Sequence, residues 1–265
     1  MWPVSIPRFY VERLGPPAVD LPEAEARHAR QSRRLSAGDV VALFDGHGRQ
    51  AVGRITTGRG RAVTITIEEI AEIPPPRPAL TLAFAVPKGP RQDTLIEKCT
   101  ELGVAALQPI ATARSIAAAS GHRLDKWHRT AVEAAKQSSQ AWLPELRNLC
   151  TLQDVLRDRS TNDMILLAAS AGNVDGDEKP EGNMDRPSSC PRGFVQPRLI
   201  TDMLAELREA SRVFAIIGPE GGWTDEEIAE ALAARARPVS LGPNVLRIET
   251  AAVALAAIIH GLLKT

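Results

Sequence analysis

Two patterns of apolar and polar positions divide the chain. In the first part, apolar and polar residues alternate, as at Val63, Ile65 and Ile67, and turns rich in glycine separate the alternating runs. A period of two is typical of antiparallel strands that bury one face. We expect strands at 39–44, 50–56 and 62–70.

A helix is predicted before these strands. Asp20 is placed to cap it, Pro22 suits its first turn, and the helical pattern continues to about Leu35. Residues 1–73 are therefore predicted to form a small β-rich domain, most simply a barrel.

The segment 74–78 is predicted to be a linker, because it holds four prolines in five residues. Proline cannot donate to a sheet and keeps a spacer extended. Beyond it, apolar runs of strand length alternate with helical patterns, which predicts an α/β domain over 79–265 with a parallel sheet covered on both faces. The expected strands are 80–86, 104–110 and 164–169, and the expected helices are 91–102, 125–139 and 197–210.

Residues 170–196 interrupt this alternation. They are rich in Gly, Asp, Glu, Asn, Pro and Ser and nearly lack large apolar side chains. Such a segment cannot bury enough surface to offset its ordering entropy. We predict a disordered insertion between a strand and the following helix.

The C-terminal part contains two strand–loop–helix units in succession. In the first, the apolar run 213–217 precedes a glycine-rich loop at 218–222, and Thr224 with Glu227 forms a capping-box pattern. In the second, the run 239–241 precedes a loop and a helix that begins at Ile248. Ligands bind at the carboxyl ends of strands in open α/β sheets, so a ligand site is expected at these loops.

Composition narrows the choice of ligand and compartment. The chain has neither a Walker phosphate loop nor the dinucleotide pattern Gly-x-Gly-x-x-Gly, so we expect a cofactor held by backbone groups. Cys99, Cys150 and Cys190 fit no zinc spacing, and no metal site is predicted. The absence of a signal peptide and of a long apolar run favours a cytoplasmic protein without a membrane span.

Four segments carry a resemblance to a known family. They are 217–222 (IGPEGG), 241–251 (LGPNVLRIETA), 98–104 (KCTELGV) and 133–138 (EAAKQS). These segments resemble the ribosomal RNA small subunit methyltransferase E family of the SPOUT superfamily. The chain departs from the family's pattern at Gln140 and Asn244, where arginine is usual, and at Ile248, where threonine is usual.

The resemblance implies a fold, a cofactor and a reaction. The fold is a SPOUT-type parallel sheet with a C-terminal trefoil knot after a PUA-like β-barrel domain, and the protein is expected to form a homodimer through the knot region. The reaction is S-adenosylmethionine-dependent methylation of N3 of a uridine in 16S rRNA of the small ribosomal subunit. Cofactor-binding residues are expected to be Ala169, Ile217, Gly218, Glu220, Gly221, Gly222, Leu241, Gly242, Val245, Leu246 and Thr250.

Arg247 and Glu249 are the candidate catalytic residues. A guanidinium offers a fork of donors that can stabilise the anion left when the weakly acidic N3 proton departs. Glu249, His122 or His128 could accept that proton. The plainer interpretation of the pair is an Arg–Glu contact in which Glu249 complements the amino end of a buried helix.

Basic residues predict the RNA-binding surface, although 32 Lys and Arg balance 32 Asp and Glu over the whole chain. Arg27, Arg30 and Arg34 recur at helical spacing. Lys88, Arg91, Lys98 and Arg114 are expected to extend the surface into the second domain. The alternative is a solvated helix face with partners such as Glu23. Two other functions stay open: a SPOUT enzyme that acts on another target, such as a ribose 2′-hydroxyl, and a non-catalytic RNA-binding assembly factor.

Overall fold

The computed structural model describes residues 6–57, 62–115, 122–157, 160, 163–169 and 196–261. The chain divides into two compact units, the first with residues 1–75 and 129–143 and the second with residues 76–128 and 144–265. All but one residue of the predicted insertion 170–196 lie outside the described residues.

The first unit is built on a five-stranded sheet in the order β1-β3-β4-β5-β2. The predicted hairpin strands are confirmed, and β3, β4 and β5 pair antiparallel in sequence. Phe9, Leu43 and Ile65 are fully buried in its core. The strands are β1 (Arg8–Tyr10), β2 (Ala18–Asp20), β3 (Val40–Phe44), β4 (Arg49–Thr57) and β5 (Val63–Glu72).

The helix of this unit differs from the prediction. α1 (Glu23–Arg27) begins after Pro22 at the N-cap, with no side-chain cap. Asp20 is instead the last residue of β2, and its Oδ1 accepts a hydrogen bond from the Thr64 hydroxyl at 2.6 Å. The chain then continues as a π-helix at His28–Ser32. The predicted cap and the single α-helix to Leu35 are therefore wrong, because the sheet holds Asp20 and the helix widens after one turn.

Residues 129–143 belong by contact to the first unit, although the sequence division assigned them to the second domain. They include most of α3 (His122–Ser138), from which Lys136 Nζ lies 3.0 Å from Glu25 Oε1. Burial raises the pKa of Glu25, and Lys136 opposes part of that rise. Trp142 Nε1 donates to the carbonyl oxygen of Ile73 at 2.8 Å, at the end of β5.

The second unit contains an eight-stranded sheet in which every strand pairing is parallel. The order is β11-β13-β10-β12-β6-β7-β8, and β9 also pairs with β7. The α/β fold class is therefore confirmed. The strands are β6 (Ala79–Ala85), β7 (Ala106–Ala111), β8 (Glu145–Leu146), β9 (Cys150–Thr151), β10 (Met164–Ala168), β11 (Arg198–Leu199), β12 (Arg212–Ile217) and β13 (Arg237–Ser240).

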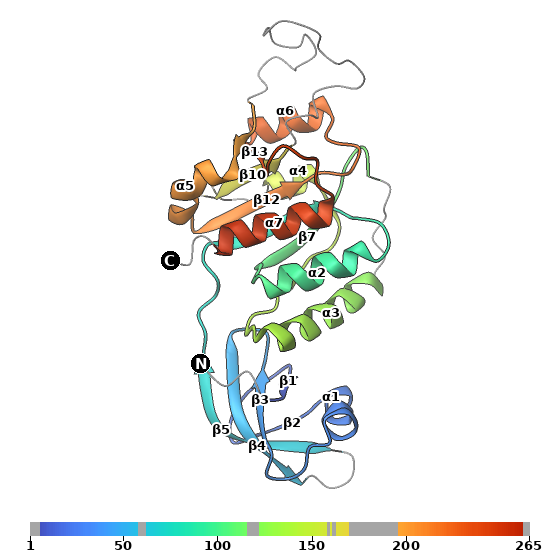
Figure 1. Cartoon of the computed structure of the whole chain (residues 1–265), viewed down its shortest axis with the longest axis vertical. Helices are drawn as coiled ribbons and strands as arrows, with labels where there is room; N and C mark the ends of the chain where they lie inside the picture. Colours follow the sequence, from blue (N-terminus) through green and yellow to red (C-terminus); the bar gives the residue numbers. More distant parts are fainter. Residues whose placement is uncertain are drawn as a thin grey trace, which may run out of the picture. The chain divides into compact units, whose positions relative to one another are not determined.

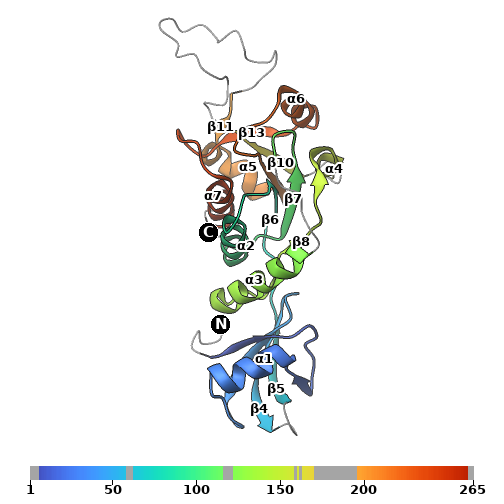
Figure 2. The same cartoon turned by 90° about the vertical axis from the view of Figure 1, so that its right-hand side faces the viewer.

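Helices cover both faces of this sheet (Figures 1 and 2). α2 (Arg91–Glu101) and α7 (Ile248–Gly261) pack together on one face, where α7 contacts β6 and β12. α4 (Leu152–Arg157) and α6 (Asp225–Ala233) pack on the other face, against Phe214 and Ile216. The helix predicted at 197–210 is wrong in its first half, where the chain forms β11 and a 3-10 turn (Ile200–Met203) before α5 (Leu204–Glu209).

Helix ends in the second unit follow the predicted signals. Gly103 lies beyond the end of α2 with φ +79°, and its N–H donates to the carbonyl oxygen of Thr100. The N–H of Val104 donates to the carbonyl oxygen of Cys99, which completes a Schellman motif. At the start of α6, Thr224 and Glu227 form the predicted capping box.

The path from β13 to α7 carries the second glycine loop. β13 pairs with β10 on the side away from β12, whereas α7 lies against β6 and β12. The connecting segment 241–247 therefore crosses the sheet at the carboxyl ends of β10 and β12. This crossing is where the trefoil knot is expected, and the knot stays a prediction.

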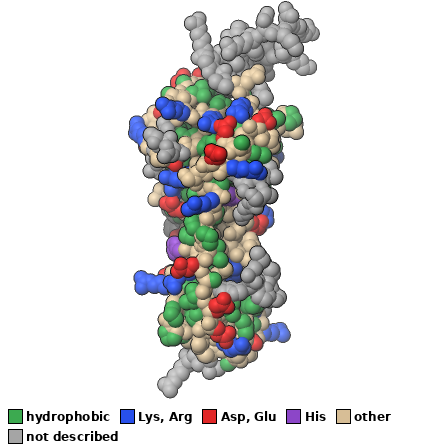
Figure 3. Space-filling model, turned by 90° about the vertical axis from the view of Figure 1, so that its left-hand side faces the viewer, with side chains coloured by type: hydrophobic (Ala, Val, Ile, Leu, Met, Phe, Trp, Pro, Cys, Tyr) green, Lys and Arg blue, Asp and Glu red, His purple; other side chains and the backbone are tan. Residues whose placement is uncertain are grey.

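Cationic and anionic side chains are interspersed on the face drawn in Figure 3, as expected for a chain with a formal net charge of +0. No helix in the described ranges is both long and apolar enough to span a membrane.

Candidate active site

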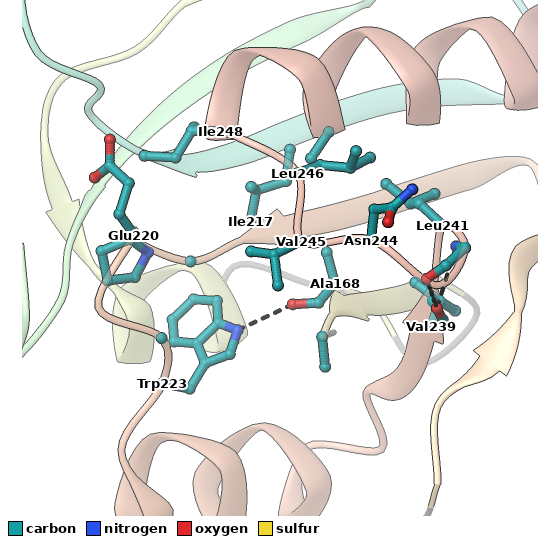
Figure 4. A pocket seen from close by; sticks show the side chains of 17 residues that line it. Ala168, Ile217, Glu220, Trp223, Val239, Leu241, Asn244, Val245, Leu246 and Ile248 are labelled. Atoms are coloured by element: carbon teal, nitrogen blue, oxygen red, sulfur yellow. Dashed lines mark hydrogen bonds between the residues drawn. The ribbon is translucent and has the colours of Figure 1, made fainter. Parts of the chain in front are cut away.

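A pocket opens at the carboxyl ends of β10, β12 and β13, where the two glycine loops meet (Figure 4). The residues that line it come from three strand ends and the start of α7: Ala168, Ala169, Ile217, Gly218, Pro219, Glu220, Gly222, Trp223, Val239, Ser240, Leu241, Gly242, Asn244, Val245, Leu246, Ile248 and Ala251.

The structure brings most of the predicted cofactor residues together in this pocket. Those that line it are Ala169, Ile217, Gly218, Glu220, Gly222, Leu241, Gly242, Val245 and Leu246. Gly221 does not line it and borders a neighbouring cavity instead. Thr250 is exposed on the first turn of α7 and lines neither space.

Sequence reasoning missed two residues that shape the pocket. Trp223 is buried, and its Nε1 donates to the carbonyl oxygen of Ala168 at 3.1 Å (Figure 4). Its ring approaches Gly218 so closely that a Cβ there would lie 2.7 Å from a ring atom. The signal in the sequence was a tryptophan that directly follows two glycines.

Ser240 is the second missed residue. Its hydroxyl donates to the carbonyl oxygen of Gly242 at 3.0 Å and accepts from the Gly242 N–H at 3.2 Å. Gly242 has φ +127°, a conformation that residues with a Cβ rarely adopt. The hydroxyl therefore fixes the turn that begins the second loop.

The charge of the pocket indicates which ligand it suits. Glu220 is the one charged side chain among the described residues that line it. A phosphorylated nucleotide would meet no cation among these described residues, whereas a ligand with a sulfonium and an ammonium group would meet no repulsion from them. The backbone groups of two glycine loops and an apolar wall fit an adenine ring and a thioether chain.

A second cavity, of about 310 Å³, adjoins this pocket. Pro219, Glu220 and Ile248 line both spaces. The second cavity also brings together Lys88, Arg91 and Arg114, three of the cations that were predicted to extend the RNA-binding surface. Among the residues that the structure describes, its lining is Ala85, Val86, Lys88, Arg91, Arg114, Ser115, Pro219, Glu220, Gly221 and Ile248.

Hydrogen bonds tie the segment after β7 to the first glycine loop and to α6. Arg114 Nη1 donates to the carbonyl oxygen of Gly221 at 2.8 Å. Glu227 Oε2 accepts from the Thr224 N–H, while its Oε1 accepts from the Ala113 N–H at 2.9 Å. The pKa of Glu226 is lowered, first by its own backbone N–H, then by the Thr224 hydroxyl and by the positive charge of Arg114.

The two candidate catalytic residues lie at the start of α7 but line neither space. Arg247 is exposed, and its carbonyl oxygen accepts the Ala251 N–H at 2.8 Å. Glu249 is half-buried, and its Oε2 is buried without a hydrogen-bond partner among the described residues. His128 is exposed on α3 and lines neither space, and the His122 side chain lies outside the described part of the chain.

The three arginines predicted for RNA binding lie on or beyond the helical segment of the first unit. Arg27 is exposed and pairs with Glu23 at 3.2 Å. Arg30, in the π-helix, donates to the carbonyl oxygen of Ala62. Arg34 follows the helix with φ +53°, so the three do not share the single α-helical face that their spacing predicted.

Over the residues that the structure describes, no group of three or more His, Cys, Asp and Glu side chains is placed to hold a metal ion.

Family models match both parts of the chain. One described as an RNA methyltransferase domain matches residues 74–260, and one described as an RNA methyltransferase PUA domain matches residues 21–68. Two similar proteins named ribosomal RNA small subunit methyltransferase E come from Synechocystis and Mycobacterium bovis. The first is 31% identical and covers 96% of this chain and 76% of its own length. The second is 34% identical and covers 94% of this chain and 90% of its own length.

Solved structures agree with this match. The structure of ribosomal RNA small subunit methyltransferase E from Neisseria gonorrhoeae bound to S-adenosyl methionine has a TM-score of 0.77 at 27% identity, and covers 97% of this chain and 98% of its own. A probable rRNA methyltransferase from Porphyromonas gingivalis has a TM-score of 0.80 at 27% identity, with the same coverage of 97% and 98%. The chain belongs to the ribosomal RNA small subunit methyltransferase E family.

Proposed function

We propose that this protein uses S-adenosyl-L-methionine to methylate N3 of a uridine in the 16S rRNA of the small ribosomal subunit. The observation that carries the proposal is the glycine-loop pocket at the carboxyl ends of β10, β12 and β13. It presents backbone groups and an apolar wall, and its described lining residues include no cation. The similar Neisseria gonorrhoeae protein, whose structure holds S-adenosyl methionine, supports this cofactor.

Methyl transfer from this cofactor requires few chemical steps of the protein itself. When bound, the cofactor would supply a methyl group attached to a sulfonium, and the sulfur would leave as a neutral thioether without help from the protein. The N3–methyl bond forms as the sulfur–methyl bond breaks, and the N3 proton must leave. The protein has to orient the base and stabilise the imide anion, whose charge spreads to O2 and O4.

Arg247 and Glu249 are the residues that we propose for this step. The exposed guanidinium of Arg247 is available to donate to a uracil oxygen, and the buried Oε2 of Glu249 has an open acceptor position within the described structure. An acceptor left without a partner costs stability unless a ligand satisfies it, which supports a role for Glu249 in substrate binding or proton removal.

We propose that the two units divide the work, the first binding RNA and the second binding the cofactor. We also propose a homodimer formed through the expected knot region. Val245, in the second glycine loop, is an apolar side chain with 72% exposure, and a second copy that covered it would remove this surface from water. Sedimentation velocity at micromolar concentration measures this association, and a monomer there would contradict it.

The experiment that tests the proposed function has two steps. Calorimetric titration with S-adenosyl-L-methionine measures cofactor binding, and a non-catalytic assembly factor would show none. Incubation with small ribosomal subunits and with naked 16S rRNA, followed by mapping of the modified nucleotide, identifies the product. We expect uridine methylated at N3 and a rate that rises with pH as the N3 proton is lost more easily. A ribose-methylated product would identify the other SPOUT reaction.

A further inference from the structure

The second cavity differs in charge from the cofactor pocket beside it. Within the described part of the chain, Lys88, Arg91 and Arg114 line it together with one carboxylate, that of Glu220. The cofactor pocket, by contrast, has Glu220 as its one charged lining residue among those described. Cationic linings concentrate anions, so the second cavity suits an anionic ligand and the pocket does not.

The two spaces share a wall that brings their ligands close together. Pro219, Glu220 and Ile248 line both, and Ile248 is the first residue of α7. In Figure 4 the Glu220 carboxylate points away from Val245 and the middle of the pocket. It pairs there with Arg91 at 3.1 Å. A ligand in the second cavity would therefore lie next to a cofactor in the first pocket, with Pro219 and Ile248 between them.

Hydrogen bonds fix the segments that carry Lys88, Arg91 and Arg114. Gln92 Nε2 donates to the carbonyl oxygen of Pro87 at 2.8 Å, which fixes the turn that carries Lys88 and Arg91. Arg114 is held by the carbonyl oxygen of Gly221. A guanidinium fixed through one nitrogen keeps its other N–H groups in a defined direction, which is the geometry that phosphate recognition uses.

We infer that the second cavity binds the backbone phosphate of the target nucleotide through Arg114 and Lys88, and that Arg91 is shared between this phosphate and Glu220. The phosphodiester anion would anchor the nucleotide so that its base reaches the cofactor pocket past Ile248. The inference rests on the proposed function for the identity of the nucleotide. It does not rest on turnover, because a phosphate site can be measured by binding alone.

The first test measures RNA affinity and its salt dependence with the non-reactive product S-adenosylhomocysteine present. Arg114→Ala should weaken RNA binding about tenfold, since a hydrogen bond to a charged group is lost. The slope of log affinity against log salt should fall by about 1. Arg114→Lys keeps the positive charge but loses the paired N–H donors of the guanidinium. Its RNA affinity should lie between those of the wild type and Arg114→Ala. Cofactor affinity should stay at the wild-type value, which also shows that each variant is folded.

Arg198→Ala is the matched control. Arg198 is an arginine of the same unit, on the edge strand β11, and its exposed ion pair with Glu206 contributes little stability. It should change neither RNA affinity nor the salt slope. Wild-type affinity and slope in Arg114→Ala would overturn the phosphate site while leaving the proposed methylation standing.

The second test removes the charge from the RNA instead of the protein. Methylphosphonate linkages, which are neutral, are placed one at a time on either side of the mapped uridine. One of them should weaken binding to the wild-type protein by a factor similar to that of Arg114→Ala, and should add little further loss in that variant. Fully additive losses would overturn the pairing of Arg114 with this phosphate. If the wild-type protein neither binds cofactor nor methylates RNA, the proposed function fails, and the affinity comparison still decides the phosphate site.

Discussion

At the scale of single residues, the Ser240 hydroxyl stabilises a turn that lines the cofactor pocket. It makes two hydrogen bonds to Gly242 and so closes the turn at the start of the second loop. Ser240→Ala should cost about 1 kcal/mol of stability, the typical contribution of a hydrogen bond. Because the loosened turn must be reordered when the cofactor binds, affinity for S-adenosyl-L-methionine should fall roughly fivefold.

The control for this variant is Ser138→Ala. The Ser138 hydroxyl donates to the carbonyl oxygen of Ala134 at 2.8 Å, within α3 and outside the pocket. Chemical denaturation should show a comparable loss of stability in both variants, while calorimetry should show weaker cofactor binding only in Ser240→Ala. Equal cofactor affinities in the two variants would mean that the turn forms without the hydroxyl.

The limits of sequence reasoning at this scale are spatial. The glycine loops were predictable, because strand, glycine run and capping pattern follow one another in the chain. Trp223 and Ser240 act on residues that the fold brings near, namely Ala168 and Gly242, and neither contact has a periodic signal. Gly221 was placed among the cofactor residues because it belongs to the glycine run, yet it faces Arg114 in the second cavity.

At the scale of elements, Glu227 links the start of α6 to the segment that carries Arg114. One carboxylate oxygen completes the capping box and the other accepts the Ala113 N–H. Glu227→Ala should therefore lose both interactions, at a cost of about 1–2 kcal/mol. Arg114 should lose its fixed position, so RNA affinity should also fall, by roughly threefold or more on the same scale.

Thr224→Ala separates these two effects. It removes the hydroxyl of the capping box but leaves the Glu227 carboxylate to hold Ala113. Its stability should drop by about 1 kcal/mol, whereas its RNA affinity should match that of the wild type. Thermal unfolding and RNA titration on both variants make the comparison. An equal loss of RNA affinity in the two would show that α6, and not the tie to Ala113, positions Arg114.

Elements were predicted well where a local signal decides them and poorly where tertiary contacts do. Gly103 and the Thr224 box mark helix ends from within the sequence, and the structure confirms both. The helix after Pro22 instead changes to a π-helix at His28, which no propensity scale encodes. The strands β8 and β9, which each pair with β7, have two residues each and are too short for any period to appear.

At the scale of the whole molecule, a net charge of zero conceals an uneven distribution of charge. Cations gather in the second cavity of the second unit and on the helical segment of the first unit, whereas the cofactor pocket has one described charged side chain, Glu220. The sequence showed the balance of 32 and 32 charges but could not show that Lys88, Arg91 and Arg114 converge, because the sheet order brings the ends of β6 and β7 together with the loop after β12. Strand order depends on crossovers between distant segments, and a single sequence does not reveal it.

The division of labour between the units leads to the last prediction. The combined variant Arg27→Ala, Arg30→Ala and Arg34→Ala removes three cationic side chains from the first unit. Arg27 has an exposed ion pair with Glu23, which it can exchange for a phosphate at little cost. If all three contact phosphates, RNA affinity should fall and the slope of log affinity against log salt should decrease by about 2, since each contact releases counterions.

Cofactor affinity gives the internal control, because the pocket is built wholly from residues of the second unit. It should not change in the triple variant. Arg54→Ala serves as a matched single substitution, since Arg54 is an exposed arginine of the same unit that pairs with Glu68 at 2.8 Å. Wild-type RNA affinity and salt slope in the triple variant would assign these arginines to a solvated surface. RNA binding would then depend on the cations of the second cavity. Arg114→Ala would therefore change the slope of log affinity against log salt more than the triple variant does.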